Sequence, residues 1–153
     1  MKMLLASALV LLGTATALGQ EDLRVDTTKL YVTDPAACDA LSNQGVDAFS
    51  DIDFLTLDFD DGIQGMEFHC TFFDVKGRET TSYLFVDAIC SAPGEVYPDT
   101  LAVTPFTETQ IQVVSSYDST MSLMGQYEPD SQVAAPGATL YTRCDNLSEI
   151  PVD

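Results

Sequence analysis

Three aspartates in one short segment are the first residues whose types and spacing could do chemistry. The segment 55–70 reads LTLDFDDGIQGMEFHC and carries Asp58, Asp60 and Asp61. Carboxylate oxygens suit calcium, although the ion usually takes six or more of them. An EF-hand loop does not fit, because placing Gly62 at its sixth position puts apolar residues where ligands are needed. A weak calcium site at these aspartates is therefore one interpretation, and an acidic turn is the other.

The register of the strands around the segment bears on this choice. Asp61-Gly62 is a favoured dipeptide for a two-residue hairpin turn, which would set Asp60 opposite Ile63. Because a slip of one residue reverses the faces of a strand, this pairing predicts which side chains are buried. Asp58 and Asp60 then point outward. The predicted buried row is Leu55, Leu57, Phe59, Met66, Phe68, Cys70 and Phe72.

His69 is the sole histidine, so a hydrolase that works through an imidazole would have to combine His69 with carboxylates. Such a mechanism also needs a nucleophile and a cleft around the histidine. The sequence has no G-x-S-x-G motif, which marks one common class of serine hydrolase. We therefore expect a protein that is not an enzyme and has no cofactor other than the candidate calcium, with the hydrolase as a third alternative.

The elements that must position these residues are mostly strands. Beyond the first twenty residues, short runs rich in Val, Thr, Phe, Tyr and Ile alternate with Gly, Pro, Asp and Asn, which is typical of antiparallel sheets. Asp34 and Pro35 predict the start of one short helix near 35–43, and 91–99 and 126–138 read as loops. We expect an all-β fold, a small antiparallel β barrel or sandwich of about eight short strands. The predicted strands are 28–33, 53–60, 63–74, 81–91, 99–104, 109–115, 120–125 and 138–144.

The four cysteines predict two disulfides, because an even set in an exported chain usually pairs. A hairpin turn at Lys76-Gly77 would place Cys70 and Cys90 roughly 20 Å apart along the strands, too far for a bridge. Two connectivities remain. We expect Cys38–Cys70 and Cys90–Cys144, because Cys70 would face the strand into which the Cys38 segment leads.

Residues 1–19 have one lysine, an apolar run and small residues near the end, the pattern of a secretory signal. Removing them leaves one exported domain, 20–153, with five basic and 24 acidic residues and a net charge of −19 with histidine neutral. A chain so acidic is unsuited to nucleic acid or anionic membrane surfaces, which are bound through Lys and Arg. We expect a periplasmic or secreted protein without membrane insertion.

In compartment, size and β content, the chain is similar to small periplasmic lysozyme-inhibitor barrels. That resemblance implies a partner that is a cationic enzyme, and the negative charge would steer cationic molecules toward the surface. The sequence therefore favours a non-catalytic binding module for a cationic protein or peptide. The alternative is a structural module that calcium stabilises through Asp58, Asp60 and Asp61.

Overall fold

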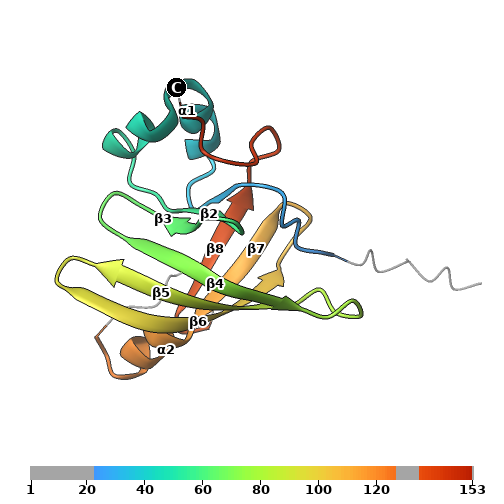
Figure 1. Ribbon diagram of the computed structural model, residues 1–153, viewed down its shortest axis with the longest axis vertical. Coiled ribbons are helices and arrows are strands. Elements are labelled where there is room, and N and C mark those ends of the chain that lie inside the picture. The colour runs from blue at the N-terminus through green and yellow to red at the C-terminus, as the bar shows by residue number, and fades with distance from the viewer. Residues whose placement is uncertain (1–22, 127–134, 153) are drawn as a thin grey trace, which may run out of the picture.

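A computed structural model describes residues 23–126 and 135–152, and in these residues eight antiparallel strands close into a barrel. Each strand pairs with its neighbours in the sequence, and the last pairs with the first (Figure 1). The strands are β1 Tyr31–Val32, β2 Thr56–Asp58, β3 Gly62–Gln64, β4 His69–Gly77, β5 Leu84–Ala92, β6 Glu95–Pro105, β7 Gln110–Ser115 and β8 Ala138–Arg143. The predicted all-β fold is confirmed, and of the two predicted architectures, barrel or sandwich, the structure is a barrel.

The main core lies inside the barrel, and it follows from the alternation of side chains along each strand. In β5, Val86, Ala88 and Cys90 are buried, whereas Phe85 and Ile89 between them are exposed. The other buried members of this core are Tyr31, Leu57, Ile63, Cys70, Leu101, Val103, Ile111, Val113 and Tyr141.

A second, smaller core lies outside β1. Leu30 and Val32 point away from the barrel and pack against the helix α1, Ala37–Gln44, which continues as the 3-10 helix η1, Gly45–Ser50. The predicted short helix is thus confirmed, although it begins two residues later than expected. The carboxylate of Asp34 accepts a hydrogen bond from the N–H of Ala36 at 2.9 Å, which orders the turn before the helix.

Both predicted disulfide pairings are wrong: the bridges are Cys38–Cys144 and Cys70–Cys90. Cys70 and Cys90 are direct partners across β4 and β5. The error lies in the turn, because β4 runs to Gly77 and pairs it with Leu84, which leaves a six-residue connection at 78–83. Moving the turn to that connection brings the two cysteines together.

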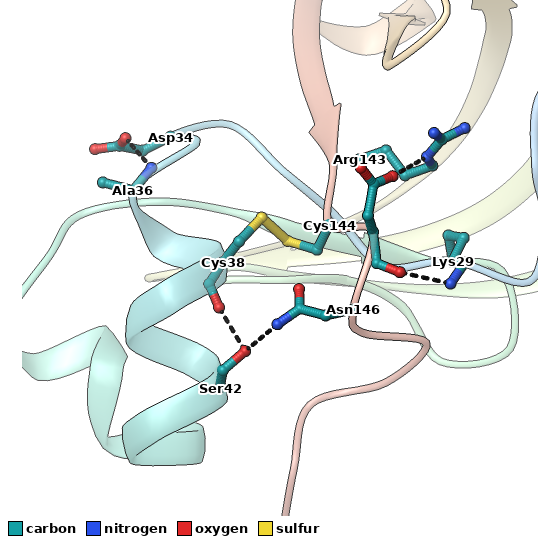
Figure 2. The surroundings of a disulfide bond; sticks show 9 residues. Lys29, Asp34, Ala36, Cys38, Ser42, Arg143, Cys144 and Asn146 are labelled. Carbon is teal, nitrogen blue, oxygen red and sulfur yellow. Dashed lines mark hydrogen bonds and ion pairs between the residues drawn. A yellow bond between two sulfur atoms is a disulfide. The ribbon is translucent and has the colours of Figure 1, made fainter.

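The bridge Cys38–Cys144 fastens α1 to the segment that follows β8, with 5.4 Å between the Cα atoms. Figure 2 shows the polar contacts around it. Asn146 donates to the Ser42 hydroxyl at 2.8 Å, and Ser42 donates to the carbonyl of Cys38 at 2.9 Å. The small core and the barrel are therefore joined by a covalent bond and by side chains of both segments.

Two predicted strands differ from the structure. The predicted strand 63–74 is two strands, because Gly65 donates from its N–H to the carbonyl of Phe68 at 2.7 Å and turns the chain between β3 and β4. The predicted strand 120–125 is wrong, since α2, Ser116–Leu123, is a helix that lies against β6 and β7. The predicted loop 91–99 is a short turn around Pro93 and Gly94, after which β6 begins.

Two disulfides are stable in an oxidising compartment, which indicates a protein that functions outside the cytoplasm. The predicted signal at 1–19 and most of the predicted loop 126–138 lie outside the described residues. In the part of the chain that is described, no helix has both the length and the apolar character needed to cross a bilayer.

Candidate functional site

The hairpin tip that carries the three aspartates has a register different from the predicted one. Asp58 pairs with Gly62 and Leu57 with Ile63, so Phe59, Asp60 and Asp61 form a three-residue connection. The predicted outward position of Asp58 is wrong, because its side chain is buried. Its carboxylate accepts hydrogen bonds from the N–H groups of Asp60, at 3.0 Å, and of Asp61.

A two-residue type I′ turn would need positive φ at both Asp61 and Gly62, but among the described residues only glycines have positive φ. Gly62 has a φ of +107°, and a side chain there would strike the carbonyl of Cys70 on the adjacent strand. Only glycine allows this close approach. The turn at Gly65–Phe68 then changes which face the later residues occupy. Most of the predicted row points inward as expected, but Met66 is 65% exposed and Ile63 is buried.

The turn uses the carboxylate of Asp58 for its own backbone. Burial raises the pKa of Asp58, and the negative charge of Asp61 raises it further, while the backbone N–H groups lower it. Asp60 and Asp61 themselves are exposed. Within residues 23–126 and 135–152, no group of three or more His, Cys, Asp or Glu side chains is arranged to hold a metal ion. The calcium site remains a prediction.

His69 is exposed at the start of β4 and pairs with Ser91 of β5. Both line an open hollow of about 570 Å³ on the barrel wall, together with Asp61 and Glu67. No hydrogen bond joins His69 to Ser91 among the contacts of the described residues, so the activation that a serine nucleophile requires is not formed there. The hydrolase remains an untested alternative.

The most developed site is a cavity of about 340 Å³ inside the barrel. It reaches the end of the barrel formed by the turns at 65–68 and 93–94 and by α2, which we call the α2 end (Figure 1). Exposed Glu95 is among its lining residues, so the cavity communicates with the surface. Its apolar wall comes from residues of six strands, of the segment before β2 and of the turn at 65–68, among them Leu55, Ile63, Phe68, Cys70, Leu101 and Val113.

At one side of this cavity, the buried carboxylate of Asp99 holds α2 onto the barrel. It accepts hydrogen bonds from the hydroxyls of Ser115 and Ser116 and from the N–H groups of Thr100 and Tyr117, at 2.5 to 3.0 Å. The hydroxyl of Ser115 in turn accepts from the N–H of Asp118 at 2.9 Å, which caps the helix. Both carboxylate oxygens of Asp99 therefore accept hydrogen bonds that hold the fold together.

Asp118 lies beside Asp99 in the first turn of α2 and also lines the cavity. Burial raises the pKa of its carboxyl, the charge of Asp99 raises it further, and the hydroxyl of Ser115 lowers it. Tyr141 also lines the cavity, and burial raises the pKa of its phenol well above its usual range. The site therefore holds a carboxyl whose charge is costly and a tyrosine that stays neutral.

Two stacked tyrosines form the rim beside these acids. The rings of Tyr97 and Tyr117 lie 3.8 Å apart between centroids and are inclined by 18°. The phenol of Tyr117 donates to the carboxylate of Glu95 at 3.0 Å. Tyr97 lines the cavity with its ring, so the entrance offers both an aromatic surface and carboxylates.

The charge around the α2 end is of one sign. The cavity adjoins the open hollow that His69 lines and a third hollow of about 470 Å³, and Phe68 lines all three. No lysine or arginine is among their described lining residues. The acids that line them are Asp51, Asp53, Glu67, Glu95, Asp99 and Asp118, together with Asp61, which reaches the first hollow from the connection 59–61.

Sequence reasoning placed Leu55, Phe68 and Cys70 in a buried row but missed the acids of the cavity, and one signal could have revealed part of the site. Ser115 and Asp118 are spaced as in a helix-capping pattern, which predicts a helix where we expected a strand. Asp99 carried no such signal, since it followed a proline in a segment that reads as a loop. Its role appears only when β6 and β7 pair and place it beside Ser115.

Comparison with known proteins gives no match. No protein-family model fits the chain. No curated protein is significantly similar to it in sequence. No solved structure matches it significantly.

Proposed function

We propose that this protein is a non-catalytic, periplasmic or secreted binding module, and that the α2 end of its barrel binds a cationic protein or peptide. The observation that carries the proposal is the separation of charge between the two barrel ends. The hollows at the α2 end are lined by acids without a lysine or arginine among their described residues. Like the lysozyme-inhibitor barrels to which it is similar in size, it would act by occupying a basic surface.

Four of the five basic residues that follow residue 19 are at the opposite end of the barrel, which we call the loop end because the connections 59–61, 78–83 and 106–109 form it. Lys76 contacts Asp74 and Asp87, and Arg143 contacts Asp145 at 2.8 Å. Lys29 donates to the carbonyl of Asp145 at 2.7 Å, and Arg78 follows the end of β4. Basic side chains therefore offset acids at the loop end.

Apolar side chains at the α2 end give a partner something to bury besides charge. Met66 projects from the turn at 65–68, and Phe49, Ile52 and Phe68 line the third hollow beside it. Interfaces commonly combine an apolar centre with a charged rim, and the rim accelerates association and selects partners. Asp51, Asp53 and Glu67 supply such a rim here.

The test compares two variants with the same change of charge. The first, Asp51→Asn/Asp53→Asn/Glu67→Gln, neutralises exposed acids at the α2 end, and the control, Asp60→Asn/Glu79→Gln/Glu108→Gln, neutralises one acid in each connection of the loop end. Binding to a lysozyme and to an unrelated cationic protein of similar charge is measured by calorimetry at about 0.15 M salt, where long-range attraction is screened.

We expect the first variant to lose about tenfold or more in affinity for the preferred partner and the control to lose about twofold or less. Equal losses would show that net charge alone is responsible. Binding that lacks preference among cationic proteins and disappears at this salt concentration would overturn the proposal.

A further inference from the structure

We propose that the barrel cavity binds a small organic cation that has an apolar body and one protonated amine, with the carboxylate of Asp118 as its counter-charge. The inference concerns the interior of the barrel and a small molecule, so it goes beyond the macromolecular partner proposed for the outer surface of the α2 end. Either can hold if the other fails.

The size and the wall of the cavity call for a small, mostly apolar ligand. Eight-stranded barrels are just wide enough to be filled by side chains or to hold one small molecule. Here about 340 Å³ remains inside, at the lower end of the roughly 300 to 1,000 Å³ found for ligand sites. Leu55, Ile63, Phe68, Leu101 and Val113 line this space from several sides, which suits an aryl or alkyl body.

The charges of the cavity select a cation. Glu95, Asp99 and Asp118 are among its lining residues, and the described lining contains no lysine, arginine or histidine. A carboxylate or phosphate ligand would meet like charges in a poorly solvated space and would be repelled. A protonated amine would instead reduce the repulsion that already exists between Asp99 and Asp118.

Of these acids, Asp118 is the one whose carboxylate suits a ligand inside the barrel. Asp99 already accepts hydrogen bonds from two hydroxyls and two N–H groups. Glu95 is exposed at the rim and accepts from the phenol of Tyr117. Asp118 is half-buried, and no ion pair within the described residues reaches it. A buried carboxylate is stabilised strongly by a cation that reaches it.

The aromatic rim fits the same ligand. Tyr97 lines the cavity on β6, the strand that also carries Asp99 and Glu95. A cation near the face of a tyrosine ring is attracted by the negative charge above the ring, more strongly where water is excluded. An amine held at Asp118 would therefore lie in a space bounded by an acid, a tyrosine and an apolar wall.

The experiment uses three probes of one shape: 2-phenylethylamine, the neutral 2-phenylethanol and the anionic phenylacetate. Their affinities for the oxidised full domain are measured by calorimetry at fixed salt. We expect the amine to bind about tenfold or more tightly than the alcohol and phenylacetate to bind weakest. In Asp118→Asn the preference for the amine should disappear, while the alcohol binds as before. The matched control is Asp51→Asn, which removes an exposed acid outside the cavity and should change neither affinity.

Two further measurements keep the test independent of how well Asp118→Asn folds. Ala92→Phe places a large side chain in the cavity wall at the end of β5 and should abolish binding of the amine and the alcohol alike. In the wild-type protein, the affinity for the amine should rise with pH as Asp118, whose pKa is raised by burial, loses its proton, whereas the affinity for the alcohol should stay constant.

Four results would overturn the inference. Equal affinities for the amine and the alcohol would show an apolar cavity without charge selection. A loss of amine binding as large in Asp51→Asn as in Asp118→Asn would assign it to net charge. Binding that Ala92→Phe leaves intact, or no binding of any probe at millimolar concentration, would exclude the cavity as the site.

Discussion

The two ends of one barrel use buried aspartates in different ways. At the loop end, Asp58 accepts the N–H groups of Asp60 and Asp61 and so shapes a three-residue turn. At the α2 end, Asp99 accepts hydrogen bonds from four donors and holds a helix in place. Asp118 lies beside it and lines the cavity. The first end uses its buried carboxylate for its own backbone, whereas the second has, beside buried Asp99, the half-buried carboxylate that we propose as the counter-charge of a ligand.

The two ends also differ in how their acidic side chains are neutralised. At the loop end, basic side chains lie close to acids, as Lys76 does to Asp74 at 3.2 Å. At the α2 end, acids accumulate around hollows without basic neighbours among the described lining residues. An acidic protein thus gains a surface of uneven charge because four of its five basic residues after residue 19 lie at one end, which net charge alone does not reveal.

Removing the disulfides should have the largest effect on stability, and it tests whether the barrel cavity depends on the bridge outside the barrel. Cys70 lines the cavity, whereas Cys38–Cys144 lies outside the barrel wall. Closing a 106-residue separation restricts the unfolded chain more than closing a 20-residue one. We expect Cys38→Ala/Cys144→Ala to lower the free energy of unfolding by about 4.7 kcal/mol and Cys70→Ala/Cys90→Ala to lower it by about 3.3 kcal/mol in urea titrations.

The same variants should separate stability from the cavity. The less stable one, Cys38→Ala/Cys144→Ala, should keep the cavity unchanged under native conditions, because neither cysteine lines it. A larger loss of stability from removing Cys70–Cys90 would contradict the loop-closure argument and would assign the shorter bridge a greater role in holding β4 and β5 together.

The anchor of α2 comes next in expected effect. Asp99→Ala removes the acceptor of two hydroxyls and two N–H groups, and some of these donors stay buried without a partner. We expect a loss of about 3 kcal/mol in the free energy of unfolding, measured by urea titration. The control Asp60→Ala, an exposed residue of the loop end, should cost about 0.5 kcal/mol or less. Similar losses in both variants would show that the α2 end is not anchored through Asp99.

Alternating patterns made the barrel predictable from the sequence. The predicted strands 109–115 and 138–144 match β7 and β8 within a residue, because apolar and polar side chains alternate and Pro or Gly residues mark the adjoining loops. The seven residues predicted to form a buried row follow the same rule, and only Met66 is clearly exposed. Local alternation determines which face is buried even where the pairing is misjudged.

The strand pairing was predicted wrongly where residues typical of turns lie inside a strand. Lys76-Gly77 has turn chemistry, yet the chain continues as a strand and turns within 78–83, which lacks Gly and Pro. That displacement alone reversed the disulfide assignment. The cavity could not be predicted for a related reason: Asp99 and Asp118 meet only because β6 and β7 pair in one register and α2 folds back over them.

The smallest expected effect is the change in melting temperature on replacing Asp58. It distinguishes a structural turn from a cation site at the loop end. Because burial raises the pKa of Asp58, its ionised form costs stability, and that cost appears as pH rises through the folded-state pKa. Asp58→Asn keeps an oxygen for the N–H groups of Asp60 and Asp61 and removes the charge. Its melting temperature should exceed that of the wild type at about pH 7, and the difference should disappear at about pH 3, where the carboxyl is protonated in both the folded and the unfolded states.

Adding calcium sharpens the comparison of melting temperatures between Asp58→Asn and the wild type. An ion bound at the tip would make the wild type, and not the variant, the protein that melts higher. Bound calcium would stabilise the ionised aspartates, so the wild type would melt higher with calcium at matched ionic strength, and Asp58→Asn would lose that gain. We expect no such shift, because one oxygen of Asp58 already accepts two backbone N–H groups and calcium prefers six or more oxygens. A rise in the wild type that Asp58→Asn and Asp60→Asn/Asp61→Asn both abolish would instead establish the calcium-stabilised module, and the loop end would then hold a ligand as well.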